Sequence, residues 1–242
     1  MQYFMDTTET IPLSVGFSHY DGLHIVWLCA LVVFLVVNCV WYRKMHTDGR
    51  ARWRKGIAAA LLADELFKVV MLFAGHRYLA DYLPLHLCSI NIFIITYHAF
   101  HPSKLLDNFL YLVCTPGTLA ALLFPSWTSL PLGNFMHIHS FTVHILLIAY
   151  PVVLTVGGDF RLDVKWIGKC LGFLIVMAIP IYGINLLLDT NFMFLMYAEK
   201  GNPLYWFGQN WGSHLWGFPV IICGVVIVMY LPVLLMRRFG RK

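Results

Sequence analysis

Long, uninterrupted apolar segments restrict the fold of this chain more than any other feature. Each is close to the roughly 17–25 residues that a helix needs to cross a bilayer. The runs are continuously apolar rather than alternating, which argues against a membrane β-barrel. They predict an all-α, polytopic membrane protein with one integral membrane domain, residues 1–242, and about seven transmembrane helices. The expected spans are 22–42, 57–75, 83–101, 105–124, 137–157, 166–188 and 216–236.

Composition and the first residues agree with this class. Hydrophobic residues make up 60% of the chain and charged residues only 12%, whereas soluble domains have about 25% charged residues. Residues 1–18 include Asp6 and Glu9 but no Lys or Arg, so they lack the basic start of a signal peptide. We therefore expect the first apolar segment to remain as a helix.

Positive charge predicts the orientation, because cytoplasmic loops carry an excess of Lys and Arg. With seven spans, the side opposite the cytoplasm carries only Arg77 and Lys200, and the N-terminus lies outside. We expect a multi-pass protein of the cell membrane. The predicted cytoplasmic residues are Arg43, Lys44, Arg50, Arg52, Arg54, Lys55, Lys104, Arg161, Lys165, Lys169, Arg237, Arg238, Arg241 and Lys242.

Two segments depart from simple apolar spans. Thr115-Pro116-Gly117 lies inside the fourth span and predicts a kink or break. The outer segment 189–215 and the start of the last span contain Trp206, Trp211 and Trp216, which suits a cap at the level of the lipid headgroups.

Charged residues inside a span are costly and mark candidate sites. The second span contains Asp64, Glu65 and Lys68, and Lys68 follows Glu65 by one helical turn. One interpretation is a structural ion pair that faces the bundle. The other is that Glu65 orients or ionises a catalytic group.

A cysteine and several histidines lie at similar depths on two helices that enter from the same side. Cys88 follows Pro84, which we expect in the first turn of its helix. His137, Ser140 and His144 share one face of the fifth span. A His can remove the thiol proton to give a nucleophilic thiolate. Packing alone is the competing interpretation for Cys88, and interfacial placement is the competing interpretation for the histidines.

Other site chemistries are less well supported. The six cysteines form no CxxC motif and lie almost entirely in apolar runs, so we expect neither disulfides nor a zinc site. His137-x-His139 is not a helical ligand spacing, and there is no HExxH. No basic stripe suggests nucleic-acid binding. We therefore expect no metal, no cofactor and no nucleic-acid partner.

Three motifs resemble a known family. They are LPLHLCSIN at 83–91, TPGTLAALLFPSWTSLPLGNFMHIHS at 115–140 leading into TVHILL with His144, and NFMFL at 191–195, followed by Lys200 and Pro203. Together they resemble the bacterial YwaF family of integral membrane proteins, which is related to eukaryotic transmembrane protein 164. The eukaryotic relative is regarded as a phospholipid acyltransferase with a Cys and a His in its active site.

The resemblance implies a phospholipid acyltransferase with Cys88 as nucleophile and His144 as its partner. Combined with the depth of these two residues and the charge of Glu65 inside its span, it predicts acyl transfer between phospholipid and lysophospholipid near the outer leaflet, with His144 as base and Glu65 in support. We expect Cys88 and a histidine of the fifth span to line a cavity whose deeper, apolar half holds an acyl chain. His137 and His139 remain alternative partners of Cys88. A non-catalytic transporter or receptor for a small solute or lipid is the alternative function. The expected partners are membrane lipids, and the oligomeric state stays open. Candidate substrate-binding residues are His86, Asn91, Asn134, His137, His139, Asn191 and Lys200.

Overall fold

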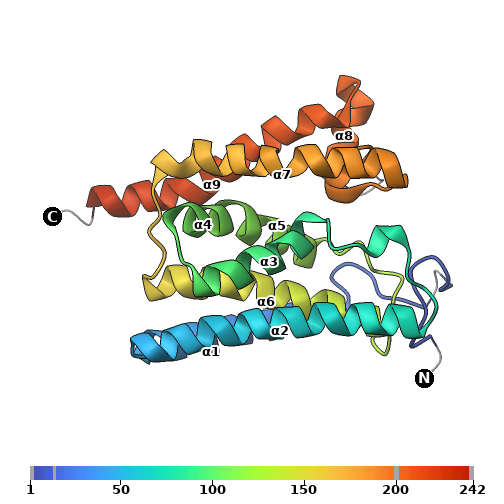
Figure 1. Ribbon diagram of the computed structural model, residues 1–242, viewed down its shortest axis with the longest axis horizontal. Helices are drawn as coiled ribbons and strands as arrows, with labels where there is room; N and C mark the ends of the chain where they lie inside the picture. Colours follow the sequence, from blue (N-terminus) through green and yellow to red (C-terminus); the bar gives the residue numbers. More distant parts are fainter. Residues whose placement is uncertain (1–2, 13–14, 199–201, 240–242) are drawn as a thin grey trace.

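The computed structural model describes residues 3–12, 15–198 and 202–239, and these residues form helices and connecting segments without strands. The elements run in the order shown in Figure 1. They are α1 (Gly22–Lys44), α2 (Thr47–Ala74), η1 (Ala80–Tyr82), α3 (Leu87–Phe100), α4 (Lys104–Phe109), η2 (Leu110–Cys114), α5 (Thr115–Leu123), α6 (Phe135–Gly157), η3 (Val164–Trp166), α7 (Ile167–Leu188), η4 (Phe192–Phe194), α8 (Pro203–Trp211), η5 (His214–Trp216) and α9 (Gly217–Phe239).

Six segments of the described chain are helical, long and apolar enough to cross a membrane, which identifies a multi-pass membrane protein. The expected second span, α2, is not among them. It has 28 residues, ample for a crossing at 1.5 Å per residue, but Asp64, Glu65 and Lys68 interrupt its apolar stretch. Helix α2 is therefore long enough to cross a membrane, but it is less apolar than the other six segments.

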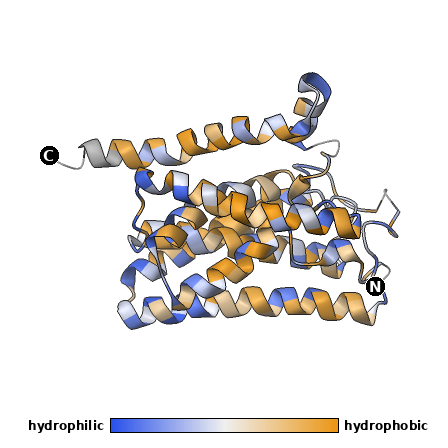
Figure 2. Ribbon diagram, turned by 45° about the horizontal axis from the view of Figure 1, so that its top comes forward, coloured by the Kyte–Doolittle hydropathy of each residue, from blue (hydrophilic) through white to orange (hydrophobic). Residues whose placement is uncertain are grey.

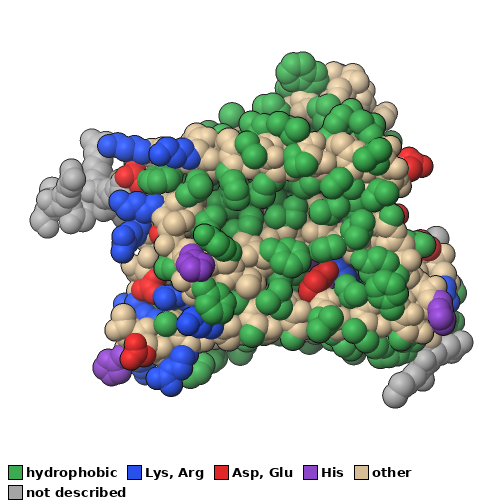
Figure 3. Space-filling model, viewed as in Figure 1, with side chains coloured by type: hydrophobic (Ala, Val, Ile, Leu, Met, Phe, Trp, Pro, Cys, Tyr) green, Lys and Arg blue, Asp and Glu red, His purple; other side chains and the backbone are tan. Residues whose placement is uncertain are grey.

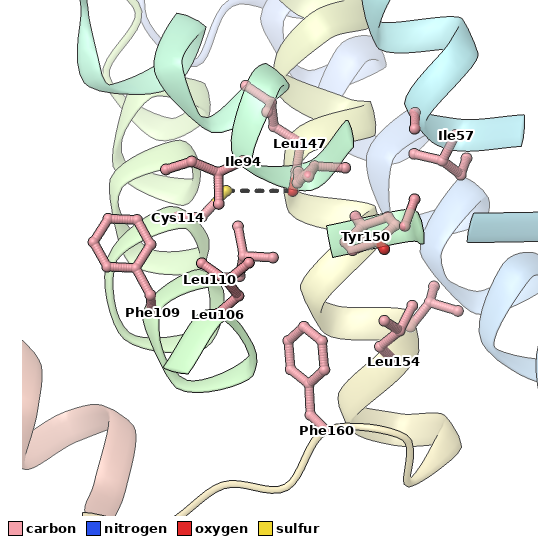
Figure 4. Packing of buried hydrophobic residues seen from close by; sticks show 14 of the residues in the cluster. Ile57, Ile94, Leu106, Phe109, Leu110, Cys114, Leu147, Tyr150, Leu154 and Phe160 are labelled. Carbon is pink, nitrogen blue, oxygen red and sulfur yellow. Dashed lines mark hydrogen bonds between the residues drawn. The ribbon is translucent and has the colours of Figure 1, made fainter. Parts of the chain in front are cut away.

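Helix α6 is the central element of the bundle. It packs against α1, α2, α3 and α5, while α7 and α9 lie on the far side of α4 and α5 (Figure 1). Large side chains from several helices fill the space between α6 and the α4–α5 segment, among them Phe109, Leu110 and Tyr150, each fully buried (Figure 4). This packing holds α3 and α6, which carry the expected site residues, in fixed relation.

Apolar side chains also cover the outside of the bundle. Hydrophobic residues run along most of the length of the long helices (Figure 2) and form a broad belt across the molecule (Figure 3). Most Lys and Arg side chains on the visible face gather at one end, away from α8 (Figure 3). There Asp159 pairs with Arg50 at 2.6 Å and Arg54 at 3.2 Å, and accepts a hydrogen bond from Tyr42. The apolar belt matches a bilayer core, and the basic end matches a headgroup region.

The expected break at Thr115-Pro116-Gly117 is replaced by a continuous helical path. Residues Leu110–Cys114 form a π-helical turn between α4 and α5. The backbone N–H of Thr115 bonds to the Leu110 carbonyl, and its hydroxyl donates to the same oxygen at 3.2 Å. Pro116 then lies in the first turn of α5, where its missing N–H is tolerated. The wider turn absorbs the proline without ending the helix.

Two helix starts also differ from expectation. Helix α3 begins at Leu87 with His86 as N-cap, so Pro84 lies before the helix and not in its first turn. Residues preceding a proline favour extended backbone, and Leu83 has ψ of 142°. Helix α2 begins at Thr47, ten residues before the expected start at 57, so Arg50–Lys55 lie on its first turns rather than in a loop.

Candidate functional site

One small cavity collects the polar residues of three helices. Its lining includes Glu65 of α2, Cys88 and Ser89 of α3, and His139 and His144 of α6. Its volume is about 60 Å³. The cavity thus brings together a thiol, two imidazoles and a carboxylate within the apolar part of the bundle.

Cys88 lies in the first turn of α3, one residue after the helix begins. The first backbone amides of a helix have no carbonyl partner within it. His86 provides no side-chain cap, and among the described residues no bond to the amides of Leu87, Cys88 or Ser89 is found. The Cys88 sulfur therefore sits beside free N–H groups and the positive end of a helix dipole, which favours a developing negative charge.

His144 is held in one orientation and one tautomer. Its Nδ1 lies 2.6 Å from the Ser140 carbonyl oxygen. A carbonyl can only accept, so Nδ1 carries the proton and a neutral ring has its lone pair on Nε2. The ring also stacks on Trp127, with centroids 5.1 Å apart and planes at 21°. These contacts fix the ring at the cavity that Cys88 also lines, and among the described residues no hydrogen bond joins His144 to the Cys88 sulfur.

Charged side chains surround His139. Glu65 accepts a bond from Lys68 at 2.5 Å, and both side chains are less than a tenth exposed, as expected for an inward-facing pair. His139 Nε2 lies 3.9 Å from Glu65, and His139 Nδ1 lies 3.4 Å from Asp64 without the geometry of a hydrogen bond. Asp64 and Glu65 thus lie beside the His139 ring, whereas His144 Nε2 has no hydrogen-bond partner among the described residues.

The cavity is too small for an acyl chain. Pockets that enclose drug-sized ligands measure roughly 300–1,000 Å³, whereas this cavity measures about 60 Å³. The apolar part of its lining consists of Ile92, Val143 and Leu147, and these side chains bound the cavity. The expectation that its deeper half encloses a chain is therefore wrong, because side chains of α3 and α6 pack directly against each other there.

His137 and Asn134 lie outside the cavity lining. His137 is fully buried, receives a bond from Trp27 Nε1 at 3.0 Å, and donates through Nδ1 to the Leu130 carbonyl. Asn134 caps α6 by accepting from the amides of Met136 and His137, and its Nδ2 donates to two carbonyls of the N-terminal segment. The hydrogen-bonding groups of both side chains are therefore paired with other groups of the protein.

His86 and Asn191 belong to a neighbouring region. The His86 ring packs edge-on against Phe192 of η4, with centroids 5.1 Å apart. Asn191 receives bonds from the amides of Met196 and Tyr197 and donates to the Tyr197 carbonyl. Asn191 therefore shapes the loop that His86 touches.

The two remaining candidates are Asn91 and Lys200. Asn91 lies on α3, is 1% exposed, and its Oδ1 has no hydrogen-bond partner among the described residues. It does not line the cavity. Lys200 falls outside the described residues.

The sequence interpretation overlooked a second buried polar cluster. His98 of α3 bonds to Asp107 of α4 through Nε2 and to the Tyr150 hydroxyl through Nδ1, both at 2.8 Å. The neighbouring Asn108 accepts from Tyr230 of α9 and donates to two carbonyls. An Asp within the expected fourth span was the available signal. These hydrogen bonds link α3, α4, α6 and α9, so this cluster ties the helices together.

No group of three or more His, Cys, Asp or Glu side chains suited to a metal ion occurs within the described ranges. All six cysteines are free thiols.

The family follows from a comparison with protein-family models. The model of the TMEM164 family matches residues 16–230, which is most of the chain. The chain belongs to the TMEM164 family. The match includes the cavity residues of α2, α3 and α6 and the loop around η4. Searches of curated proteins and of solved structures found no match.

Proposed function

We propose that this protein transfers fatty acyl chains between phospholipid and lysophospholipid through an acyl-Cys88 intermediate. The observation that carries the proposal is the shared cavity of Cys88 and His144, with His144 Nε2 left free by the bond from Nδ1 to Ser140. Membership of the TMEM164 family agrees with a membrane setting.

In the first half-reaction, His144 Nε2 takes the thiol proton of Cys88. The sulfur attacks the ester carbonyl carbon of a phospholipid, and the carbonyl oxygen becomes negative. The ester C–O bond then breaks, and the leaving lysophospholipid oxygen takes the proton from His144. The products are a lysophospholipid and a thioester on Cys88.

In the second half-reaction, a lysophospholipid hydroxyl gives its proton to His144 and attacks the thioester carbonyl. The C–S bond breaks, and the Cys88 sulfur recovers the proton. Water in place of the lipid hydroxyl would give hydrolysis instead, so exclusion of water from the thioester decides between transfer and hydrolysis.

Stabilisation of the oxyanion comes from the start of α3. The free amides of Cys88 and Ser89 stand next to the sulfur, where the carbonyl oxygen of the substrate would develop its charge.

The size of the cavity implies how the lipid enters. Only the ester group would reach Cys88, while the acyl chain stays among the exposed apolar side chains on the outside of the bundle. A membrane provides such surroundings at no cost to the chain.

The proposed topology has seven crossings, with α2 as the second, the N-terminus outside and the C-terminus in the cytoplasm. We expect a cysteine placed at Thr10 to react with a membrane-impermeant maleimide added to intact cells. A cysteine placed at Asp48 should react only after the membrane is opened. The same maleimide applied to the unmodified protein supplies the background from the native cysteines. Labelling of both positions from one side would mean an even number of crossings between them.

The covalent step is tested by mass. Purified protein in lipid nanodiscs is mixed with phosphatidylcholine that carries a deuterated acyl chain. The reaction is stopped with acid, and the mass of the intact protein is then measured. We expect a mass increase equal to one deuterated acyl group, located on Cys88 by peptide mapping and removed by hydroxylamine. The Cys29→Ala variant, which changes an exposed cysteine on α1, should gain the same mass. Absence of the adduct together with full transfer activity would contradict the thioester and leave direct transfer.

A further inference from the structure

A second and larger cavity lies in the cap formed by the end of α7, the loop after η4, and α8. Its volume is about 380 Å³, within the usual range for a bound small molecule. Three tyrosines from three different segments line it: Tyr182 of α7, Tyr197 of the loop and Tyr205 of α8. Gln209, Ser213 and His214 add polar groups beside these rings.

The loop between the two cavities is held in an unusual conformation. Met193 and Phe194 both have positive φ, at 58° and 55°, which costs free energy for residues other than glycine. Asn185 stabilises this loop by bonding to both the carbonyl and the amide of Phe192. Asn191 does the same for the segment that follows, through Met196 and Tyr197. The loop is therefore built into one shape by buried amide side chains.

This loop connects the cap cavity to the Cys88 site. On one side, His214, which lines the cap cavity, donates from Nε2 to the Phe194 carbonyl at 3.1 Å. On the other side, the rings of Phe192 and Phe194 contact His86, with centroids 5.1 and 6.2 Å away. His86 is the N-cap of α3 and precedes Cys88 by two residues. A ligand in the cap cavity would thus lie one loop away from the reacting thiol.

The level of the cavity suits a lipid headgroup. Trp206, Trp211 and Trp216 are each more than half exposed, and all three adjoin or lie within a few residues of the cavity lining. Exposed tryptophans gather where a bilayer meets water. A ligand held here would have its polar end at the interface and its chains in the apolar belt.

We propose that the cap cavity binds the quaternary ammonium group of a choline headgroup. Aromatic side chains attract such cations through the negative faces of their rings, and a quaternary ammonium has no N–H that would require a hydrogen-bond acceptor. The phosphate would stay at the mouth, and the ester bonds would extend towards Cys88. The inference that this binding selects the lipid substrate rests on the proposed acyl transfer.

Binding is measured without chemistry in the Cys88→Ala protein, reconstituted in nanodiscs of phosphatidylglycerol. The probes are lysophosphatidylcholine, lysophosphatidylethanolamine and lysophosphatidylglycerol. We expect the choline lipid to bind at least about tenfold more tightly than the other two, and Tyr205→Leu to remove most of that preference. Tyr205→Phe keeps the ring and should retain it. The control is Tyr97→Leu, an exposed tyrosine on α3 outside the cavity, which should change nothing.

Equal binding of the three lipids would overturn the inference, as would preferential binding of the glycerol lipid. Unchanged choline preference in both Tyr205→Leu and Tyr182→Leu would also overturn it. Choline preference that depends on Tyr205, combined with transfer activity but no acyl adduct when the protein with Cys88 intact is tested by mass, would support the headgroup site and contradict the proposed thioester. The binding measurement therefore tests the headgroup site, and the mass measurement tests the catalysis, each separately from the other.

Discussion

Replacement of Cys88 by alanine is expected to lower acyl transfer to the uncatalysed background, a loss of more than about 10³-fold. The variant lacks the sulfur that would carry the acyl group, and no other thiol lines the cavity among the described residues. The measurement is transfer of a labelled acyl chain to lysophospholipid in nanodiscs. Cys29→Ala should retain full activity, because Cys29 is exposed on α1.

His144→Ala tests the base in the same assay and should cost about 10²–10⁴-fold. His46→Ala is the matched control, since His46 is exposed and makes no side-chain capping bond. Thermal unfolding of each variant distinguishes lost chemistry from lost structure. Full activity in Cys88→Ala would exclude the covalent mechanism. Loss of activity in His139→Ala but not in His144→Ala would move the base to the other histidine of the cavity.

Glu65→Ala is expected to lower the free energy of unfolding by about 3–5 kcal/mol, because it leaves the Lys68 ammonium buried without its partner. At the usual entropy of unfolding this corresponds to a fall in Tm of about 10 °C. The reason is desolvation: Lys68 is 6% exposed and cannot recover water without opening the bundle. Thermal unfolding in nanodiscs measures the shift.

The double variant Glu65→Leu with Lys68→Met should recover most of this loss, since an apolar pair of similar size leaves no buried charge. Asp81→Ala, at an exposed position before α3, should have little effect. A stable Glu65→Ala protein would mean that Lys68 reaches water or finds another partner. In that case Glu65 would be free for a role at the cavity that it lines.

The sequence predicted the helical class well because hydropathy is a local property. The first, fifth, sixth and seventh apolar segments match α1, α6, α7 and α9 closely. The inward-facing Glu65–Lys68 pair also followed from spacing along one helix. Helix starts were less predictable: proline and charge near α2 and α3 allow several backbone paths, and packing selected among them.

The histidines of α6 show the limit of spacing arguments. His137 and His144 share a helical face, yet His137 contacts Trp27 and the Leu130 carbonyl, whereas His144 lines the cavity with Cys88. Seven residues separate them by about 10 Å along the axis, so the same face meets different neighbours. His139, on another part of the helix, reaches the cavity as well.

The amino-acid sequence by itself determined that this chain forms apolar helices, that Glu65 and Lys68 can pair, and that a thiol and imidazoles occur on separate helices. Tertiary structure alone decided that His139 and His144, but not His137, share a cavity with Cys88. It also decided that this cavity is too small for an acyl chain, and that a tyrosine-lined pocket lies one loop away. The physical reason is that hydropathy and helical spacing act within a segment. The cavities, in contrast, form where α2, α3 and α6, or α7, α8 and the η4 loop, pack against one another.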